Sequence, residues 1–309
     1  YVGSHYKMPK PDKSVTRQMY NELAAFSLPL LFATAVQSVS QFFDTSSIQY
    51  ALTLCDKAVL SKAYNYFDGD IFTYVFGIYS SIPGMVMALG VTAVPAISSA
   101  YESDSPKFNL LINSVLKYTS ILSCFSGIIL ALFPSEILSL FYGNSNGDIA
   151  KFGSDILFYL AVTVLPCCLA SSCVFCAQSL GLSKKTILPF AVSGCIRVIT
   201  NIILIPKMTI NISAVAISNF MGFLIILIWN MIIISKNTGA SFAVKDIFVK
   251  PIFCSCTVYF AVKFIKEAFF TQTSSLLTLT ICGIICSFLT ASLLILFKCV
   301  RISDIISAK

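Results

Sequence analysis

A single arginine inside a long apolar stretch constrains the fold of this chain more than any other residue. The stretch Lys184–Pro206 begins with two lysines, ends at a proline and is mostly apolar in between, with Arg197 near its middle. As a helix, the 21 residues Thr186–Pro206 rise about 31 Å, which matches the roughly 30 Å hydrocarbon core of a bilayer. Arg197 then lies close to the membrane midplane, where a cation costs at least about 2.5 kcal/mol unless something solvates it.

Two polar neighbours indicate what surrounds this arginine. Ser193, Arg197 and Asn201 are four residues apart and therefore share one face of the helix. A polar stripe on an apolar helix faces protein or a water-filled cavity rather than lipid. We therefore expect these residues to line a cavity, with Arg197 binding an anionic substrate group, above all a phosphate, and Asn201 orienting it or contacting the substrate. A structural ion pair and snorkelling toward an interface are the alternatives.

The composition identifies the class of protein. The chain is 57% hydrophobic and 11% charged, with a mean hydropathy of +0.85, whereas soluble domains carry about 25% charged residues. This much apolar surface exceeds what one buried core uses, so we predict an all-α polytopic membrane protein with about eight transmembrane helices. The candidate spans are 23–43, 71–98, 112–133, 154–180, 186–206, 213–235, 248–269 and 275–298.

The distribution of basic residues predicts the orientation. Lys and Arg number 14 on one side of the predicted spans and 6 on the other, and the second side is rich in acidic residues. By the positive-inside rule, both ends of the chain are cytoplasmic. Residues 1–22 form a polar, basic lead-in without the apolar segment of a signal peptide, and we attribute its charge to the membrane surface rather than to nucleic acid. Because the chain opens on Tyr1, we expect it to be a piece of a longer protein.

The first predicted span carries a second polar stripe over its outer half. Its members follow the i, i+3, i+4, i+7 spacing of one helix face. They are Thr34, Gln37, Ser38, Gln41, Asp44 and Thr45. We expect the stripe to line the same cavity, because two glutamines and a carboxylate exceed what helix packing needs, with hydrogen bonds between helices as the alternative. For Asp44, capping a helix end in water is a further alternative.

Prolines interrupt several predicted spans. Each removes a backbone donor and tends to kink its helix, and transporters use bent helices to line a midplane site and to flex. The Pro83–Gly84 pair, in an unusually long second span, favours such a role most strongly. Ordinary bends, which are common in membrane helices, are the alternative. The predicted hinge or kink residues are Pro29, Pro83, Gly84, Pro95, Pro166 and Pro189.

The motifs of soluble enzymes and cofactor sites are absent from the sequence. There is no Walker loop, no GxGxxG before a strand and no HExxH. His5 is the only histidine, which excludes a histidine-based metal site or a Ser–His triad. The CVFC at Cys173–Cys176 lies in an apolar span without a partner pair, so we interpret it as small hydrophobic packing. We predict a protein that is not an enzyme and uses no metal or cofactor.

Several stretches together resemble one family. LPLLFATAVQSVSQFFDTSSI (Leu28–Ile48) looks like the seventh helix of bacterial polysaccharide-lipid flippases, and Ile71–Ser103 looks like the eighth. FPSEILSLFYG (Phe133–Gly143) is similar to the outer turn after helix nine, and the run from Phe158 to Gly239 follows helices ten to twelve. The chain thus resembles the multidrug/oligosaccharidyl-lipid/polysaccharide (MOP) exporter superfamily. Within that superfamily, the chain looks most like the branch of the polysaccharide biosynthesis, stage V sporulation protein B-like and MurJ-like lipid flippases.

The resemblance implies a fourteen-helix transporter with two lobes, of which this chain supplies helices seven to fourteen and lacks the N-terminal lobe. Residues 1–22 are then the lead-in between the lobes, 23–240 the six-helix C-terminal lobe, and 241–309 two additional helices with a tail. The resemblance also implies that an undecaprenyl-pyrophosphate-linked oligosaccharide or a peptidoglycan precursor crosses the bacterial plasma membrane by alternating access. The helix that matches the family's eighth has no arginine, unlike several MurJ-like members.

Other functions remain open at this point. A multidrug antiporter of the same superfamily expels cations and calls for an acidic cavity, whereas the predicted midplane charge here is positive. A non-transporting membrane scaffold predicts a tightly packed bundle with no cleft beside Arg197. An integral membrane polymerase predicts a catalytic carboxylate in a cleft.

Overall fold

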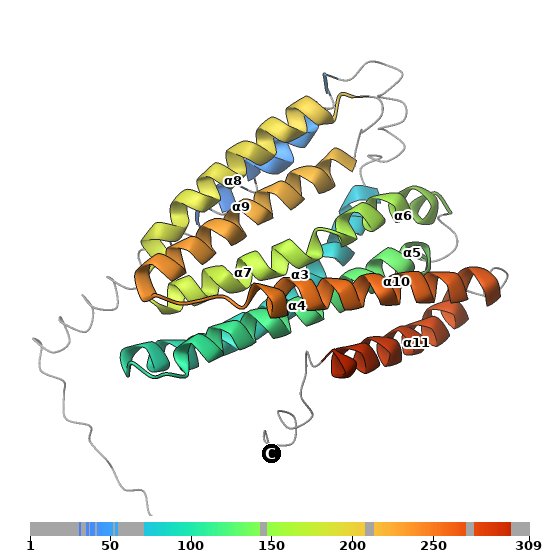
Figure 1. The fold of residues 1–309 in the computed structure, drawn as a ribbon. Coiled ribbons are helices and arrows are strands. Elements are labelled where there is room, and N and C mark those ends of the chain that lie inside the picture. The colour runs from blue at the N-terminus through green and yellow to red at the C-terminus, as the bar shows by residue number, and fades with distance from the viewer. Residues whose placement is uncertain are drawn as a thin grey trace, which may run out of the picture.

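In a computed structural model of this chain, every regular element among the described residues is a helix (Figure 1). The described residues are 31, 35–36, 38–40, 42–51, 53–54, 71–142, 147–207, 213–269 and 275–297. A partly described helical segment, 31–53, comes first. The helices that follow are α3 (Ile71–Glu102), α4 (Phe108–Leu132), α5 (Pro134–Tyr142), α6 (Gly147–Ala161), α7 (Val164–Ser179), α8 (Ser183–Leu204), α9 (Ser213–Thr238), the π-helical turn η1 (Lys245–Val249), α10 (Lys250–Phe269) and α11 (Ser275–Leu296).

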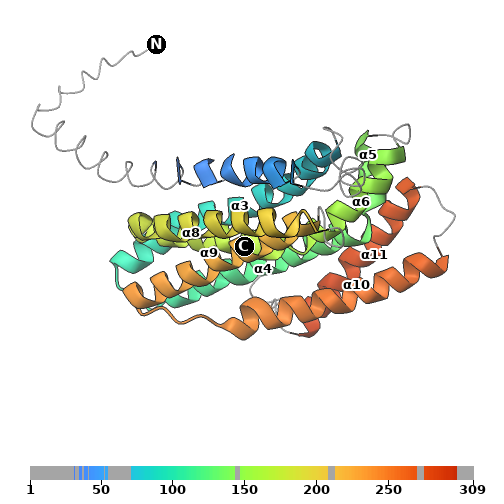
Figure 2. The same ribbon diagram turned by 90° about the horizontal axis from the view of Figure 1, so that it is seen from above.

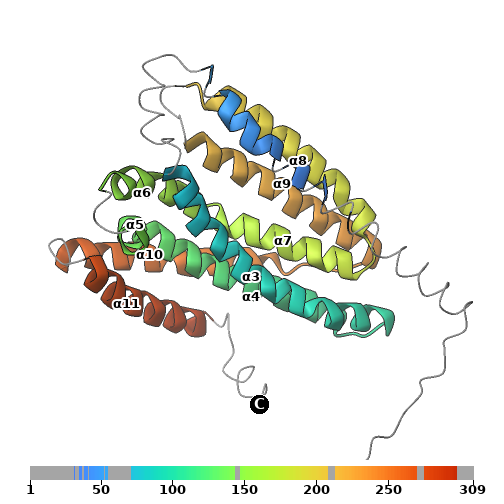
Figure 3. The same cartoon turned by 180° about the vertical axis from the view of Figure 1, so that it is seen from behind.

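The helices form a layered bundle around α7. This helix packs on α3, α4 and α9, and most of its residues are buried. Its apolar residues lie all round rather than on one face, which suits an interior position. On one side of it, α8 packs on α9, with the 31–53 segment alongside α8 (Figures 2 and 3). On the opposite side lie α10 and α11, which pack on each other and on α4 and α5.

The membrane spans follow the sequence prediction closely. Among the described residues, six helices are long and apolar enough to cross a membrane, and the bent pair α6–α7 makes a seventh candidate. They match, in order, the seven spans predicted between 71 and 298, so the fold-class prediction is confirmed. The predicted span 23–43 lies mostly outside the described residues, and the described part of that helix continues to residue 53. The lead-in 1–22 lies outside them altogether.

The predicted span 154–180 is two helices rather than one. α6 and α7 are bent by 48° across residues 162–163. Pro166 explains the break, because it has no N–H to donate to the Val162 carbonyl four residues earlier. The bend thus falls beside one of the predicted kink residues. A hinge function for it stays a prediction.

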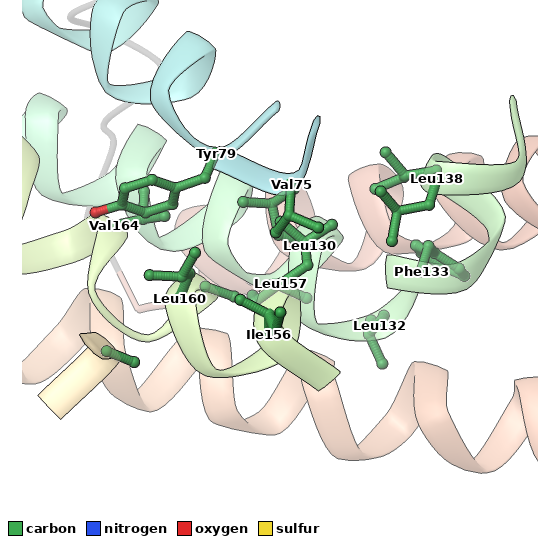
Figure 4. Close-up of a cluster of buried hydrophobic side chains, with 14 of the residues drawn as sticks. Val75, Tyr79, Leu130, Leu132, Phe133, Leu138, Ile156, Leu157, Leu160 and Val164 are labelled. Carbon is green, nitrogen blue, oxygen red and sulfur yellow. The ribbon is translucent and has the colours of Figure 1, made fainter. Parts of the chain in front are cut away.

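Thr163, which lies in this break, stabilises it through its hydroxyl group. Its hydroxyl oxygen is 2.7 Å from the Leu160 carbonyl oxygen and 2.7 Å from the Tyr79 hydroxyl, so the open helix end gains polar partners. Tyr79 reaches Thr163 from α3 and is buried. Figure 4 shows the Tyr79 ring beside Val164, at one end of a cluster of buried apolar side chains. The cluster also contains Val75, Leu130, Leu132, Phe133, Leu138, Ile156, Leu157 and Leu160.

The other predicted kink residues are distributed over two helices. Pro83 and Pro95 lie inside α3, and Pro189 lies inside α8. Pro83 and Pro189 are buried, whereas Gly84 is exposed. Pro29 lies outside the described residues. A hinge role for these positions stays a prediction.

An ion pair ties α10 to the junction of α4 and α5. Lys266 Nζ is 2.6 Å from Glu136 Oε1, and it donates to the Leu132 carbonyl, at the C-terminus of α4, at 2.7 Å. A cation at this position also complements the helix dipole. The same ammonium lies 5.1 Å from the centroid of the Phe133 ring. The last two helices are therefore fixed to the rest of the bundle by a charge contact as well as by packing.

Two asparagines on α4 hold the connection between α9 and η1. Asn113 Nδ2 donates to the Ser241 carbonyl at 2.8 Å, and its Oδ1 accepts from the Ala243 N–H at 2.7 Å. Asn109 Oδ1 accepts from the Ser241 N–H at 3.3 Å. Gly239, with φ of 69°, ends α9 in the left-handed conformation that glycine adopts readily. The domain boundary predicted after residue 240 falls in this connection and stays a prediction.

Candidate functional site

A close helix crossing holds the stem of Arg197 between α8 and α9. Gly222 on α9 makes the crossing possible, because a Cβ there would lie 2.7 Å from both Cγ and Cδ of Arg197. Ser193, one turn before the arginine, donates to the Gly222 carbonyl at 3.0 Å. Small residues of this kind let membrane helices approach closely. The stem, which is the aliphatic part of the Arg197 side chain, thus packs against the backbone of α9 at Gly222. The guanidinium lies where α8, α9 and the 31–53 segment meet.

A carboxylate from the 31–53 segment neutralises the guanidinium. Arg197 Nη1 is 3.1 Å from Asp44 Oδ2, and the same nitrogen donates to Asn219 Oδ1 at 3.1 Å. The side chains of Arg197 and Asp44 are 7% and 12% exposed. Because each ion is withdrawn from solvent, each depends on the other for its charge balance.

Asn201 and Ser47 complete the network around Asp44. Asn201 Nδ2 donates to Asp44 Oδ1 at 2.8 Å and lies 3.1 Å from Ser47 Oγ. Ser47 in turn donates to the Asp44 backbone carbonyl at 2.6 Å. Polar groups from three helices thus meet in one buried cluster, and their formal charges sum to zero.

The cluster is densely packed but not fully hydrogen-bonded. Within the described part of the chain, Arg197 Nε, Asn201 Oδ1 and Ser40 Oγ are buried without a hydrogen-bond partner, and each such group costs about 1–3 kcal/mol. Ser40 sits tightly against Gly194, where a Cβ would lie 2.3 Å from Ser40 Oγ. The Phe223 ring lies 5.3 Å from Arg197 Cζ and supplies a cation–π contact.

The structure brings together Arg197, Asn201 and Asp44 and places Ser193 on the same face of α8. Arg197 is 6% exposed and its charge is matched by Asp44, which agrees with the ion-pair alternative, and a cavity-lining role stays a prediction. Asp44 does not cap a helix end in water, because its carboxylate is buried. A substrate-binding role for these residues stays a prediction.

The rest of the polar stripe on the first span has a mixed outcome. Thr34, Gln37 and Gln41 lie outside the described residues, so their predicted place in a cavity stays a prediction. Ser38 and Thr45 are exposed, on a different side of the helix from the buried Asp44. The stripe therefore does not face one environment along its whole length.

Sequence reasoning missed the contribution of α9. Asn219, Gly222 and Phe223 all contact Arg197. The spacing of Asn219 and Gly222, three residues apart on one helix face, is a signal for close packing against a polar partner. Nothing in the sequence, however, shows which helix that face meets.

A second feature is an apolar groove of about 1020 Å³ between α3, α5 and α11. The serine hydroxyls in its wall are used within their own helices, since Ser81 donates to the Gly77 carbonyl and Ser287 to the Gly283 carbonyl, each at 2.8 Å. Met85, on its rim, is 76% exposed. The groove therefore offers hydrocarbon walls and small residues, and it suits an apolar occupant.

The CVFC motif lies in the interior of the bundle. Cys173 and Cys176 belong to a buried apolar cluster with Leu169 and Val174. Among the described residues, no three His, Cys, Asp or Glu side chains gather in a way that would hold a metal ion. The positions of the two thiols agree with the interpretation as hydrophobic packing.

These features define an all-α, multi-pass membrane protein. Its fold is similar to the solved structure of the lipid II flippase MurJ in an inward closed conformation, with a TM-score of 0.61 and 16% sequence identity. The likeness covers 89% of this chain and 54% of the flippase, so the chain spans about half the length of that protein. Neither a protein-family model nor a curated protein matches the sequence. At this identity the likeness shows the fold, and function must be argued separately.

Proposed function

We propose that this chain is part of a flippase that moves a lipid-linked anionic substrate across a membrane by alternating access. The observation that carries the proposal is the fold, which is shared with a lipid II flippase over 89% of the chain. The proposed substrate is an undecaprenyl-pyrophosphate-linked oligosaccharide or a peptidoglycan precursor. The proposed setting is the bacterial plasma membrane, with both ends of this chain cytoplasmic and an N-terminal lobe as the partner in transport.

The apolar groove supports a lipid-linked substrate. A polyprenyl chain offers only hydrocarbon, and the groove between α3, α5 and α11 presents hydrocarbon in return. Gly283 leaves room in its wall, because among the described residues no atom outside its own stretch of helix lies within 4 Å of where its Cβ would be. The bend between α6 and α7 supports the conformational change that transport requires, since interrupted helices are the parts of transporters that flex.

The buried charges lend no support to a cationic substrate. A cation antiporter calls for a carboxylate that is free to meet the drug, and Asp44 is committed to Arg197. A non-transporting scaffold accommodates this ion pair equally well. The fold likeness and the groove are what favour transport over a scaffold.

Transport by the full-length protein in proteoliposomes tests the proposal. The substrate is a fluorescent polyprenyl-pyrophosphate-linked sugar, and its exposure on each leaflet is followed by quenching. We expect the wild type to move the probe and Gly283→Trp, which fills the groove, to lose most of that activity. Phe288→Trp is the matched control, because Phe288 is on the same helix, is 72% exposed and lies outside the groove. Absence of transport by the folded wild-type protein would contradict the proposal.

A further inference from the structure

Arg197 bonds its polar neighbours through one terminal nitrogen of its guanidinium. Its hydrogen bonds to Asp44 Oδ2 and to Asn219 Oδ1 both leave from Nη1, at 3.1 Å. Its Nε is buried and has no hydrogen-bond partner among the described residues. A guanidinium binds carboxylates and phosphates best through two parallel N–H groups, and Nε with the neighbouring terminal nitrogen forms one of the edges that do so. Nε itself is packed against α9, since a Cβ at Gly222 would lie 2.9 Å from it, so Nη1 is the nitrogen for which Asp44 and another anion would compete.

Asp44 is a weak partner for such a group. It meets Arg197 with one oxygen on one nitrogen at 3.1 Å, which is longer than the roughly 2.7–2.9 Å of a good charge-assisted hydrogen bond. Its other oxygen is taken by Asn201, at 2.8 Å. A pyrophosphate carries more negative charge and more oxygens than one carboxylate, so it can compete with Asp44 for Nη1 of Arg197.

We infer that Asp44 is an internal counter-ion that occupies Arg197 in the resting protein and is displaced by a pyrophosphate oxyanion. The inference rests on the proposed function, because it assigns regulation to the site where a lipid-linked pyrophosphate would bind. In the resting state Asp44 balances the buried cation, and in the bound state the oxyanion does so. The guanidinium is thus never left without a counter-charge in the membrane.

The element that this exchange displaces is the 31–53 segment. α8 and α9 stay joined, because Gly222 packs on the Arg197 stem and accepts a hydrogen bond from Ser193. The seam, meaning the contact between the 31–53 segment and α8, is packed less completely than the contact between α8 and α9. It contains an apolar pocket of about 460 Å³ beside Cys195, and Ser40 Oγ is buried there without a partner in the described residues.

Binding of inorganic pyrophosphate to the full-length protein in nanodiscs tests the inference. Asp44→Asn removes the competing charge and keeps the side-chain shape. If the resting pair is open in about one molecule in ten, this variant binds pyrophosphate about tenfold more tightly than the wild type. Arg197→Gln and the double variant Asp44→Asn/Arg197→Gln should lose binding. Glu136→Gln, which neutralises the carboxylate of the other buried pair, is the matched control and should leave the Kd unchanged.

Unchanged or weaker binding by a folded Asp44→Asn protein would overturn the inference. If that variant fails to fold, the wild-type protein supplies the test through Cys195, which is exposed on α8 and lines the seam. Pyrophosphate should raise the rate at which a membrane-permeant maleimide labels Cys195, with Cys195→Ser giving the background. A rate that does not respond to saturating pyrophosphate would equally overturn it.

A second ligand shows whether the bound oxyanion is lipid-linked or free. It also distinguishes failure of the counter-ion exchange from failure of the proposed transport function. A polyprenyl pyrophosphate placed in the nanodisc should bind more tightly than free pyrophosphate and show the same dependence on Asp44 and Arg197. Equal affinities would overturn the lipid-linked source. Tighter binding to Asp44→Asn, together with no transport in proteoliposomes, would support the counter-ion exchange and contradict the proposed function.

Discussion

Neutralising one member of the Asp44–Arg197 pair should destabilise the protein more than neutralising both. Asp44→Asn leaves a guanidinium that is 7% exposed, and Arg197→Gln leaves a carboxylate that is 12% exposed. An uncompensated buried charge costs about 3–5 kcal/mol, and each single variant should lose about that much free energy of unfolding. The double variant leaves no charge at this site and keeps polar groups for Asn201 and Asn219, so its loss should be smaller than that of either single variant.

Reversible unfolding of the full-length protein in mixed micelles, by titration with a denaturing detergent, measures these four free energies. Glu136→Gln, at the other buried pair, serves as a control whose effect should add to that of either single variant. The reasoning fails if the losses of Asp44→Asn and Arg197→Gln simply add in the double variant. That result would mean that the two charges do not stabilise each other.

Two further predictions concern packing and the second ion pair. Gly222→Ala should lower the thermal unfolding midpoint, because its Cβ would lie 2.7 Å from the Arg197 stem. Gly283→Ala, the control, has open space for a Cβ and should be tolerated. Equal unfolding midpoints for the two variants would contradict the close crossing of α8 and α9. Lys266→Met should cost up to about 3 kcal/mol, since it leaves the Glu136 carboxylate, which is 11% exposed, without its partner. The double variant Glu136→Gln/Lys266→Met should recover part of that loss, and no recovery would rule out a stabilising pair.

Much of the fold follows from the sequence, because a membrane imposes simple rules on a chain. Long apolar segments must form helices that satisfy their own backbone groups, and this requirement placed the spans between 71 and 298. The break between α6 and α7 was harder to place. Pro166 indicates a kink, but a Pro inside a helix does not determine whether the helix bends or divides. The Thr163 contacts that stabilise the divided form come from the tertiary structure.

The sequence indicates which residues belong to the candidate site better than it indicates how they are arranged. Arg197, Asn201 and Asp44 stand out because polar groups in apolar helices must face protein or water. The sequence predicts that both stripes line one cavity, whereas the structure pairs Asp44 directly with Arg197 and Asn201. The rotation of two helices about their own axes decides this, and it depends on packing between segments far apart in the sequence. The opposite charges of Asp44 and Arg197 were the available signal for a pair.

Transport by the charge-balanced double variant tests whether the Asp44–Arg197 pair takes part in transport. Asp44→Asn/Arg197→Gln leaves no charge at this site, so we expect it to fold nearly as well as the wild type and yet not to move the pyrophosphate-linked probe in proteoliposomes. Transport by this variant at the wild-type rate would contradict the claim. In that case the ion pair would hold helices together without taking part in transport.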